Sequence, residues 1–393
     1  MTKKSVGDIA VANKAVLVRV DYNVSIKNGI VADDTRIRQS LSTIKHILSH
    51  KPKRVVLVSH LGDPEGKDEK YTLQPVANHL ASLLGRPVRL VKDYTLANVQ
   101  KELAKYVEGE VIMLENVRFY RGETLNSHSF SKKLASLGDI FVNDAFGSCH
   151  RAHASVVGVA DYLPAVAGLL LEREVEIIGK TLEKPQPPFI VVLGGAKATT
   201  KIPMIERLMT KADYVLLGGG VANTFLKAFG YRIGRSVYSP ESVRLAQTLI
   251  WRATRVDTKL FLPTDLVVGS LTQESKIGEV LRDEIPTQLQ ALDIGPKTQK
   301  EYRDIIAKAK TIIWNGPMGA NEIPVFIDGT QAIYDAIVAN KNAVSIVGGG
   351  DTLTSIRGNN HLDNITHIST GGGAMLEFIE KGTLPGLEAL NDK

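Results

Sequence analysis

The sequence predicts an α/β protein of two doubly wound, Rossmann-like domains with parallel sheets, joined by a long helix and hinge. Its 393 residues are more than one small domain requires. Short runs rich in valine and isoleucine recur in both halves, and each is followed by a turn cluster and a helix-like pattern. Such apolar runs are typical of parallel strands buried on both faces, and their alternation with helices indicates βαβ units.

The first half contains four predicted strands and one clear helix. The strands are expected at 16–20, 55–58, 111–114 and 140–142. A helix is predicted over 36–49, because apolar residues recur at helical spacing from Ile37 to Leu48 and the pair Asp34-Thr35 precedes them as a start signal.

The second half repeats this architecture without repeating the sequence. Its strands are expected at 190–193, 214–217, 311–314 and 344–347. The halves meet near the proline-rich stretch 185–188, and the pattern over 165–184 predicts a long connecting helix. We expect an N-terminal domain, a helical linker, a C-terminal domain and a tail that packs back on the N-terminal domain, at 1–170, 171–188, 189–375 and 376–393.

Composition and charge exclude several classes of protein. Lysine and arginine total 48 against 42 aspartates and glutamates, and no basic block stands out, so nucleic acid is not an expected partner. The most apolar stretch, 156–171, is interrupted by Asp161 and Pro164, so no membrane partner is expected. The N-terminus lacks the apolar core of a secretory signal, which predicts a cytoplasmic location. The single cysteine, Cys149, excludes an intrachain disulfide framework.

Glycine-rich turns follow the strands of the second half, at 194–195, 218–220, 348–350 and 371–373. Glycine lets backbone N–H groups approach an anion closely, and a helix N-terminus favours negative charge. One such turn is equally consistent with tight helix–strand packing, but four together favour a polyphosphate site. Neither the P-loop motif nor the dinucleotide motif G-x-G-x-x-G occurs.

The turns of the first half carry polar and basic groups instead. The arginines favour carboxylate or phosphate binding, since their planar fork matches both groups. A single arginine is more often a solvated charge, but several at the ends of neighbouring strands indicate an anion site. His60, His150 and His153 are weak candidates for metal ligands, because no cysteine-rich or H-E-x-x-H spacing accompanies them. These features predict a small-anion half and a nucleotide half, brought together by domain closure.

Eight motifs in order along the chain resemble those of phosphoglycerate kinase. They are RVDYNV at 19–24, SHLG at 59–62, ENVRF at 115–119, DAFG at 144–147, GGAK at 194–197, WNGP at 314–317, GGGDT at 348–352 and STGGG at 369–373. The resemblance extends from residue 16 to the tail at 384–386. It implies a monomeric, Mg²⁺-dependent kinase of glycolysis that moves a phosphoryl group between 1,3-bisphosphoglycerate and ADP, giving 3-phosphoglycerate and ATP.

The resemblance also implies a role for individual residues. The acid would be held by the N-terminal domain through Asp21, Asn23, Arg36, His60, Leu61, Gly62, Asp63, Arg118 and Arg151. ADP or ATP would be held by Lys201, Gly219, Ala291, Glu322, Gly349, Gly350, Asp351 and Thr352, with Mg²⁺ on Asp351. The catalytic set would be Arg36, Lys197, Lys201, Gly349 and Gly372.

The chain departs from the family pattern at four positions. Ser25 stands where proline is usual, Asn321 where phenylalanine is usual and Ala291 where glycine is common. The largest change is Asp63, where the family's motif normally continues with arginine. Asp63 could repel an anionic substrate, or it could point to solvent or pair with a nearby cation.

Two alternatives follow from these departures and from the fold. The first is a catalytically degenerate family member that acts as a nucleotide-binding regulator. Against it stands the retention of Arg36, Arg118, Arg151, Lys201 and Asp351. The second is a dinucleotide oxidoreductase, which the missing G-x-G-x-x-G motif disfavours.

Overall fold

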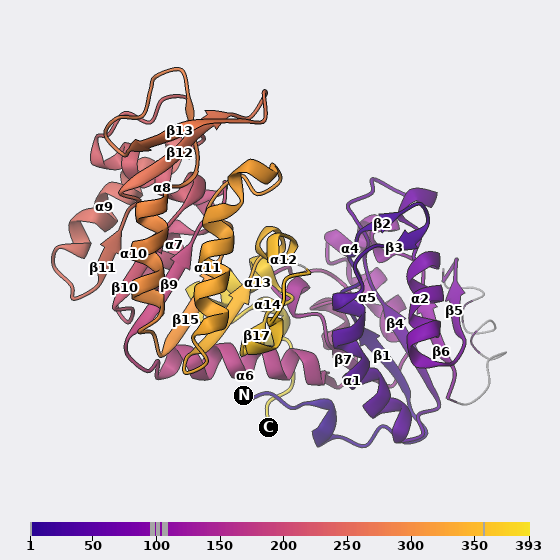
Figure 1. Cartoon of the computed structure of the whole chain (residues 1–393). Helices are drawn as coiled ribbons and strands as arrows, with labels where there is room; N and C mark the ends of the chain where they lie inside the picture. Colours follow the sequence, from indigo (N-terminus) through magenta and orange to yellow (C-terminus); the bar gives the residue numbers. More distant parts are fainter. Residues whose placement is uncertain (1, 95–98, 100–102, 104–108, 357) are drawn as a thin grey trace. The chain divides into compact units, whose positions relative to one another are not determined.

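The computed structural model describes residues 2–94, 99, 103, 109–356 and 358–393. The chain divides into two units, shown in Figure 1. The N-terminal unit comprises Met1–Glu176 together with Thr383–Lys393, and the C-terminal unit comprises Ile177–Gly382.

The N-terminal unit is built on a six-stranded parallel sheet in the order β5-β6-β4-β1-β7-β8. Its strands are β1 (Ala15–Arg19), β4 (Arg54–Val58), β5 (Val88–Val91), β6 (Val111–Leu114), β7 (Ile140–Asn143) and β8 (Ala165–Ala167). The helices of this unit are α1 (Thr35–Ser49), α2 (Gln74–Leu84), α4 (Arg121–Thr124), α5 (His128–Ala135), the start of α6 (Leu169–Glu183) and α14 (Pro385–Glu388). A small hairpin, β2 (Ile26–Lys27) with β3 (Ile30–Val31), stands apart from the sheet.

Both faces of this sheet are covered, which explains the continuous apolar runs in the sequence. Val16 and Val55 on one face pack in a core that includes Ile44 of α1. Their neighbours Leu17 and Val56 alternate to the opposite face and are also fully buried. A strand buried on both faces needs apolar side chains at every position, as parallel sheets require.

The C-terminal unit contains a second six-stranded parallel sheet in the order β11-β10-β9-β15-β16-β17. Its strands are β9 (Phe189–Leu193), β10 (Tyr214–Leu217), β11 (Lys259–Phe261), β15 (Thr311–Asn315), β16 (Val344–Gly348) and β17 (His367–Ile368). The helices are the end of α6, α7 (Ile202–Leu208), α8 (Gly219–Phe229), α9 (Val243–Ala253), α10 (Pro296–Ile306), α11 (Asp328–Ala339), α12 (Gly350–Ile356) and α13 (Gly372–Lys381). Trp314 of β15 is fully buried in the core that this sheet forms with α10 and α11.

The predicted α/β class and its two parallel sheets are confirmed, and each predicted strand is present within a residue or two of its expected bounds. The sequence pattern did not predict the edge strands β5, β11 and β17, nor an antiparallel sheet of β12 (Asp265–Ser270), β13 (Ser275–Leu281) and β14 (Gln290–Ile294). Strand β13 is largely exposed, so it lacks the apolar run by which the other strands were found.

The predicted helix over 165–184 is wrong at its start. Residues Ala165–Ala167 form strand β8, paired in parallel with β7, and helix α6 begins only at Leu169. A short apolar run fits a buried strand as well as a helix, and here pairing with a strand distant in sequence decides the outcome.

Helix α6 contains the point at which the chain passes from one unit to the other. The last residues return to the N-terminal unit, where Lys4 N donates to Asn391 O at 2.9 Å and Ala165 N donates to the Asn391 side chain at 2.7 Å. Among the described residues, no helix combines the length and apolar character that crossing a membrane requires.

Candidate active site

The predicted acid-binding residues gather at the carboxyl ends of neighbouring strands in the N-terminal unit. Asp21 follows β1, His60 follows β4, and Arg118 lies in the short helix η3 (Val117–Phe119) after β6. These three strands are adjacent in the sheet order β6-β4-β1. Parallel strands place their carboxyl ends at one edge, where ligands of doubly wound sheets bind.

Arg36, near the start of α1, is held by the carboxylate of Asp21. Arg36 Nη1 donates to both Asp21 oxygens at 3.0 Å and to the carbonyl of Asn23 at 3.2 Å. Burial acts to raise the pKa of Asp21, but Arg36, His60 and Arg19 outweigh it and hold that pKa below its ordinary value. Asp21 is therefore ionised at neutral pH, and it fixes Arg36 in place for an incoming anion.

Asn23 and Gly62 link two of the strand-end turns. Gly62 N donates to Asn23 Oδ1 at 2.9 Å, and Gly62 takes the left-handed conformation at φ +63. Leu61, also predicted as a ligand, is buried, and both of its backbone groups bond to the Asn116 side chain at 3.2 and 2.7 Å. A cavity of about 490 Å³ opens beside Asn23, Leu61 and Gly62.

Arg118 is the most enclosed of the three arginines predicted to bind the acid, with 6% of its side chain exposed. Its Nη1 donates to Gly62 O at 2.6 Å and to the Asp63 carboxylate at 3.1 Å. The Asp63 side chain is 83% exposed. Asp63 thus combines the two arrangements considered for it, since it faces solvent and pairs with a cation.

Positive charge around this edge is concentrated enough to lower the pKa of its own members. Burial, then Arg151 among the charges, lowers the pKa of Arg118, although Asp63 opposes this. Burial and the arginines at 118 and 151 lower the pKa of His153 to about 4. Arg151 is itself exposed, with Nε donating to His150 Nε2 at 3.3 Å. An anion that entered here would relieve this repulsion.

Arg19 belongs to one of the sequence motifs, but nothing in that motif predicts its place next to this site, and no sequence pattern singled out Glu123 or Ser155. Arg19 is fully buried and donates through Nε to Ser155 Oγ at 2.8 Å and through Nη2 to His60 Nδ1 at 3.0 Å. Ser155 Oγ donates in turn to Glu123 Oε1 at 2.6 Å. A buried arginine needs a carboxylate to balance its charge, and that need was the only available signal for Glu123.

The glycine turns of the C-terminal unit also collect at one sheet edge. They follow β9, β10, β16 and β17, which belong to the same parallel sheet. A cavity of about 530 Å³ lies beside the turns that follow β9 and β10. Its lining includes four predicted nucleotide ligands: Gly219, Ala291, Glu322 and Asp351.

Close packing between turns explains why glycine is needed at two of these positions. A Cβ on Gly219, which has φ +56, would lie 2.9 Å from Gly195 N. A Cβ on Gly372 would lie 3.0 Å from the Cα of Gly349, which has φ +103. Backbone approaches backbone at both points, so the N-termini of α8 and α13 are presented to the sheet edge without intervening side chains.

Lys201 is a buried cation of this unit. It is 8% exposed, its Nζ donates to Gly194 O, and burial lowers its pKa to about 8 although Asp351 opposes this. Lys197, in contrast, is exposed in the turn that precedes it. The amine of Lys201 is thus mostly protonated at neutral pH. It lacks a direct carboxylate partner among the described residues, so a bound phosphate would supply the negative charge that balances it.

Asp351 and Thr352 occupy the start of α12 but face different surroundings. Asp351 is exposed and borders the cavity, whereas Thr352 is fully buried and accepts a hydrogen bond from Gly316 N at 2.7 Å. The described residues contain no group of three or more metal-ligating side chains. A lone carboxylate still suits Mg²⁺, because that ion commonly takes one or two carboxylates together with substrate phosphates and water.

Two residues that depart from the family pattern, Ala291 and Asn321, line this cavity. Ala291 is buried and its N–H donates to Ser236 Oγ at 2.8 Å. The Asn321 side chain donates to Ser355 of α12, and Glu322 beside it is exposed to the cavity. Where the family usually has phenylalanine, Asn321 therefore forms a hydrogen bond that links two segments of the cavity lining.

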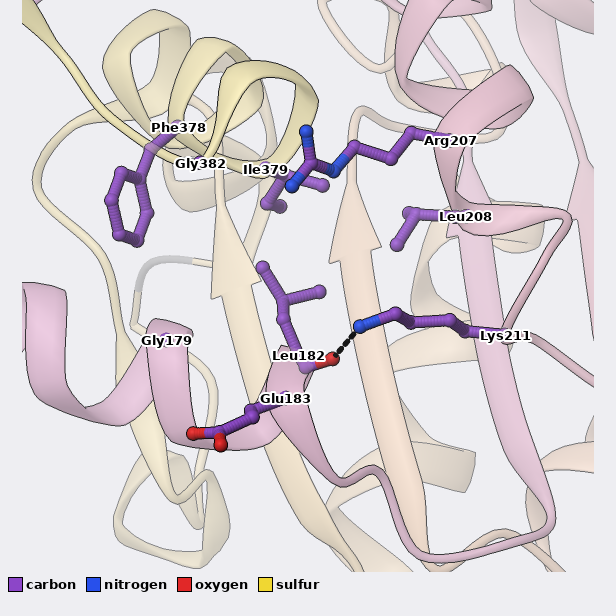
Figure 2. Close-up of a pocket in the computed structure, with 9 residues that line it drawn as sticks. All are labelled: Gly179, Leu182, Glu183, Arg207, Leu208, Lys211, Phe378, Ile379 and Gly382. Atoms are coloured by element: carbon purple, nitrogen blue, oxygen red, sulfur yellow. Dashed lines mark hydrogen bonds between the residues drawn. The ribbon is translucent and has the colours of Figure 1, made fainter.

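A separate cavity of about 190 Å³ lies within the C-terminal unit between α6, α7 and α13 (Figure 2). Lys211 Nζ donates to Leu182 O at 2.5 Å, and Arg207 donates to Glu380 O. These carbonyls belong to the last turns of α6 and α13, where intrahelical donors run out. The two cations here cap helix ends, which makes this cavity a structural junction.

Comparison with known proteins agrees with this geometry. A family model described as phosphoglycerate kinase matches residues 6–382. The chain is 50% identical to the phosphoglycerate kinase of Dictyoglomus turgidum and 47% identical to that of Pelotomaculum thermopropionicum, with 100% of each chain covered in both cases. The phosphoglycerate kinase structures from Coxiella burnetii and Pyrococcus horikoshii match with TM-scores of 0.85 and 0.87 at 41% and 34% identity, each covering 98% of both chains. The chain belongs to the phosphoglycerate kinase family.

Proposed function

We propose that this protein is a kinase that catalyses reversible phosphoryl transfer between 1,3-bisphosphoglycerate and ADP, with Mg²⁺ bound alongside the nucleotide. The observation that carries the proposal is the presence of two complementary sites in a member of this family. One unit gathers arginines and His60 at the ends of β1, β4 and β6, and the other gathers glycine turns, Lys201 and Asp351 around a cavity.

The acid would bind the N-terminal unit. Arg36, Arg118 and Arg151 would neutralise the phosphate and carboxylate of 3-phosphoglycerate, since arginine pairs with both groups bidentately. Asp21 would keep Arg36 oriented, and the turn at Asn23 and Gly62 would hold the glycerate hydroxyl region. The carboxylate of Asp63 would have to leave Arg118 or share it with the ligand.

The nucleotide would bind the C-terminal unit. Its phosphates would lie over the glycine turns that include Gly219, Gly349 and Gly350, where backbone N–H groups are accessible. Its ribose would lie near Glu322, and its base against Ala291 in the cavity wall. When bound, Mg²⁺ would be held by Asp351 and would reduce the negative charge on the phosphate oxygens.

In the direction that consumes ATP, a carboxylate oxygen of 3-phosphoglycerate bonds to the γ-phosphorus while the bond from that phosphorus to ADP breaks. The electron pair of the broken bond stays on ADP, and the reverse step remakes ATP. Lys201, Lys197 and Arg36 would stabilise the charge on the transferring group, with Gly372 and Gly349 contributing backbone donors. Because the ligands bind different units, transfer would require domain closure, which also excludes water.

A coupled assay for ATP formation from 1,3-bisphosphoglycerate and ADP tests the proposal. We expect turnover that depends on Mg²⁺. Nucleotide binding without turnover would instead support a regulatory family member. We further propose that the protein acts as a cytoplasmic monomer. The elution volume of the full chain in calibrated gel filtration would check the monomeric state.

A further inference from the structure

The imidazole of His60 has one ring nitrogen engaged by protein and the other left for a ligand. Arg19 Nη2 lies 3.0 Å from His60 Nδ1. Arginine has five N–H donors and no acceptor, so Nδ1 can only be the acceptor of this hydrogen bond. The proton of neutral His60 must then be on Nε2. Within the described parts of the chain, no protein group bonds Nε2.

Arg19 is held in this position from behind. Its Nε donates to Ser155 Oγ at 2.8 Å, and Ser155 donates to Glu123 Oε1 at 2.6 Å. Its Nη1 donates to Val20 O. Glu123 and Ser155 are both almost fully buried, and each hydrogen bond in the series has one donor and one acceptor. These contacts fix the orientation of the guanidinium, so that Nη2 is the nitrogen that faces His60.

We propose that Arg19 is a positioning residue that keeps His60 neutral in the Nε2–H form, so that the ring donates a hydrogen bond to an oxygen of the bound acid. Protonation at Nδ1 would place two donors head to head, which the geometry opposes. The inference rests on the proposed function only for the identity of the acid. The tautomer itself follows from the Arg19 contact.

The charged groups around His60 act in both directions. Burial, Arg19, Arg118 and Arg151 lower its pKa well below the ordinary value, and Asp21 opposes them. His60 should therefore contribute a fixed donor rather than a variable charge across the range in which histidine ordinarily titrates.

Nitrogen-15 NMR of the full chain labelled at histidine tests this inference, with His60→Gln assigning the resonance. We expect an unprotonated Nδ1 and a protonated Nε2, without titration between about pH 5.5 and 8. Adding 3-phosphoglycerate should shift the Nε2–H proton while Nδ1 stays unprotonated. A proton on Nδ1, or titration of the wild type in this interval, would overturn the proposal.

Variants separate positioning from folding. Arg19→Met combined with Glu123→Gln removes the donor without leaving a buried charge, and we expect a proton on Nδ1 to become detectable because that nitrogen is no longer fixed as an acceptor. Arg19→Lys should retain the Nε2–H form. Ser148→Ala is the matched control, since it removes only the longer acceptor of the same Arg19 Nη2, at 3.4 Å. If the double variant folds and His60 behaves as in the wild type, Arg19 does not control the ring.

The assay and the spectra can fail independently. Turnover with an unresponsive Nε2–H resonance would remove the donor role of His60 and leave the proposed function standing. The expected tautomer in a chain without turnover would leave Arg19 as the residue that sets the state of His60 and would remove the proposed function.

Discussion

The two candidate ligand sites recognise anions by different physical means. At the N-terminal site, polar and charged side chains are paired in advance: Asp21 holds Arg36, and Arg19 holds the neutral His60. At the C-terminal site, the candidate anion ligands are mainly backbone N–H groups. Gly219 and Gly372 pack closely against the turns at Gly195 and Gly349, where a side chain would not fit. The first site depends on charge balance between side chains, whereas the second depends on the absence of side chains.

This difference has a consequence for how each site tolerates substitution. A side-chain network loses affinity when one member leaves its partner unpaired in a buried place. A glycine turn loses affinity when any side chain is added, however small. Substitutions at the two sites should therefore differ in the kind and the size of their effects.

Replacing Lys201 by alanine should reduce kcat by about a hundredfold to a thousandfold, the effect of removing one preorganised charge-stabilising group. Lys201 is the one cation of the C-terminal site that burial places against the glycine turns in the described structure. Steady-state kinetics measures the effect, with Lys211→Met as a control outside the site. A kcat within about threefold of the wild type would remove Lys201 from the transition state.

Replacing Asp351 by asparagine should reduce kcat by about a hundredfold and raise the Mg²⁺ concentration needed for half-maximal rate. Binding of 3-phosphoglycerate, measured by calorimetry, should be unchanged because that ligand belongs to the other unit. Asp363→Asn makes the same charge change at an exposed position in η9 (Leu362–Asn364) and should have little effect. An unaltered Mg²⁺ dependence in Asp351→Asn would exclude metal binding by this carboxylate.

Replacing Gly372 by alanine should raise KM for ATP by about tenfold, because the new Cβ would press on Gly349 and displace the turn. The adjacent position supplies a matched control, since a Cβ on Gly373 meets nothing within 4 Å. Gly373→Ala should therefore retain the KM of the wild type. Equal values for the two variants would show that this packing does not shape the nucleotide site.

The pH dependence should differ between the two sites. Burial lowers the pKa of Lys201 to about 8, so its amine is charged below that pH and neutral above it. With the acid saturating, kcat/KM for ATP should fall as pH rises through about 8, by roughly tenfold one pH unit higher. Lys201→Arg keeps the charge and should abolish this inflection. A flat wild-type profile would mean that Lys201 stays protonated throughout.

Replacing Asp63 by asparagine should lower KM for 3-phosphoglycerate by about two- to fivefold, the range that an exposed ion pair is worth. The substitution frees Arg118 from a carboxylate that competes with the substrate. The gain should shrink as salt increases, and KM for ATP should not change. Glu65→Gln removes the same charge two residues away, so an equal effect there would reduce the result to general electrostatics.

Much of the fold followed from the sequence because its signals are local. The alternation of apolar runs with helical spacing placed the four inner strands of each parallel sheet, and β-branched runs buried on both faces are hard to mistake. The edge strands β5, β8, β11 and β17 and the antiparallel sheet of β12, β13 and β14 could not be placed in the same way. Their apolar runs are short or broken by exposure, and pairing with distant strands decides their conformation.

The sequence by itself determined which chemical groups stand at the strand ends: arginines and histidines in one half, glycines in the other. Only the tertiary structure decided what those groups touch. Arg19 lies 136 residues from Ser155 and 41 residues from His60, and no local pattern links them. The same holds for Asp63, whose pairing with Arg118 depends on two turns that meet at the sheet edge. Residue type fixes the charge and hydrogen-bonding capacity of a side chain. Its partners and its pKa depend on its surroundings and its burial, and these are set only when the chain folds.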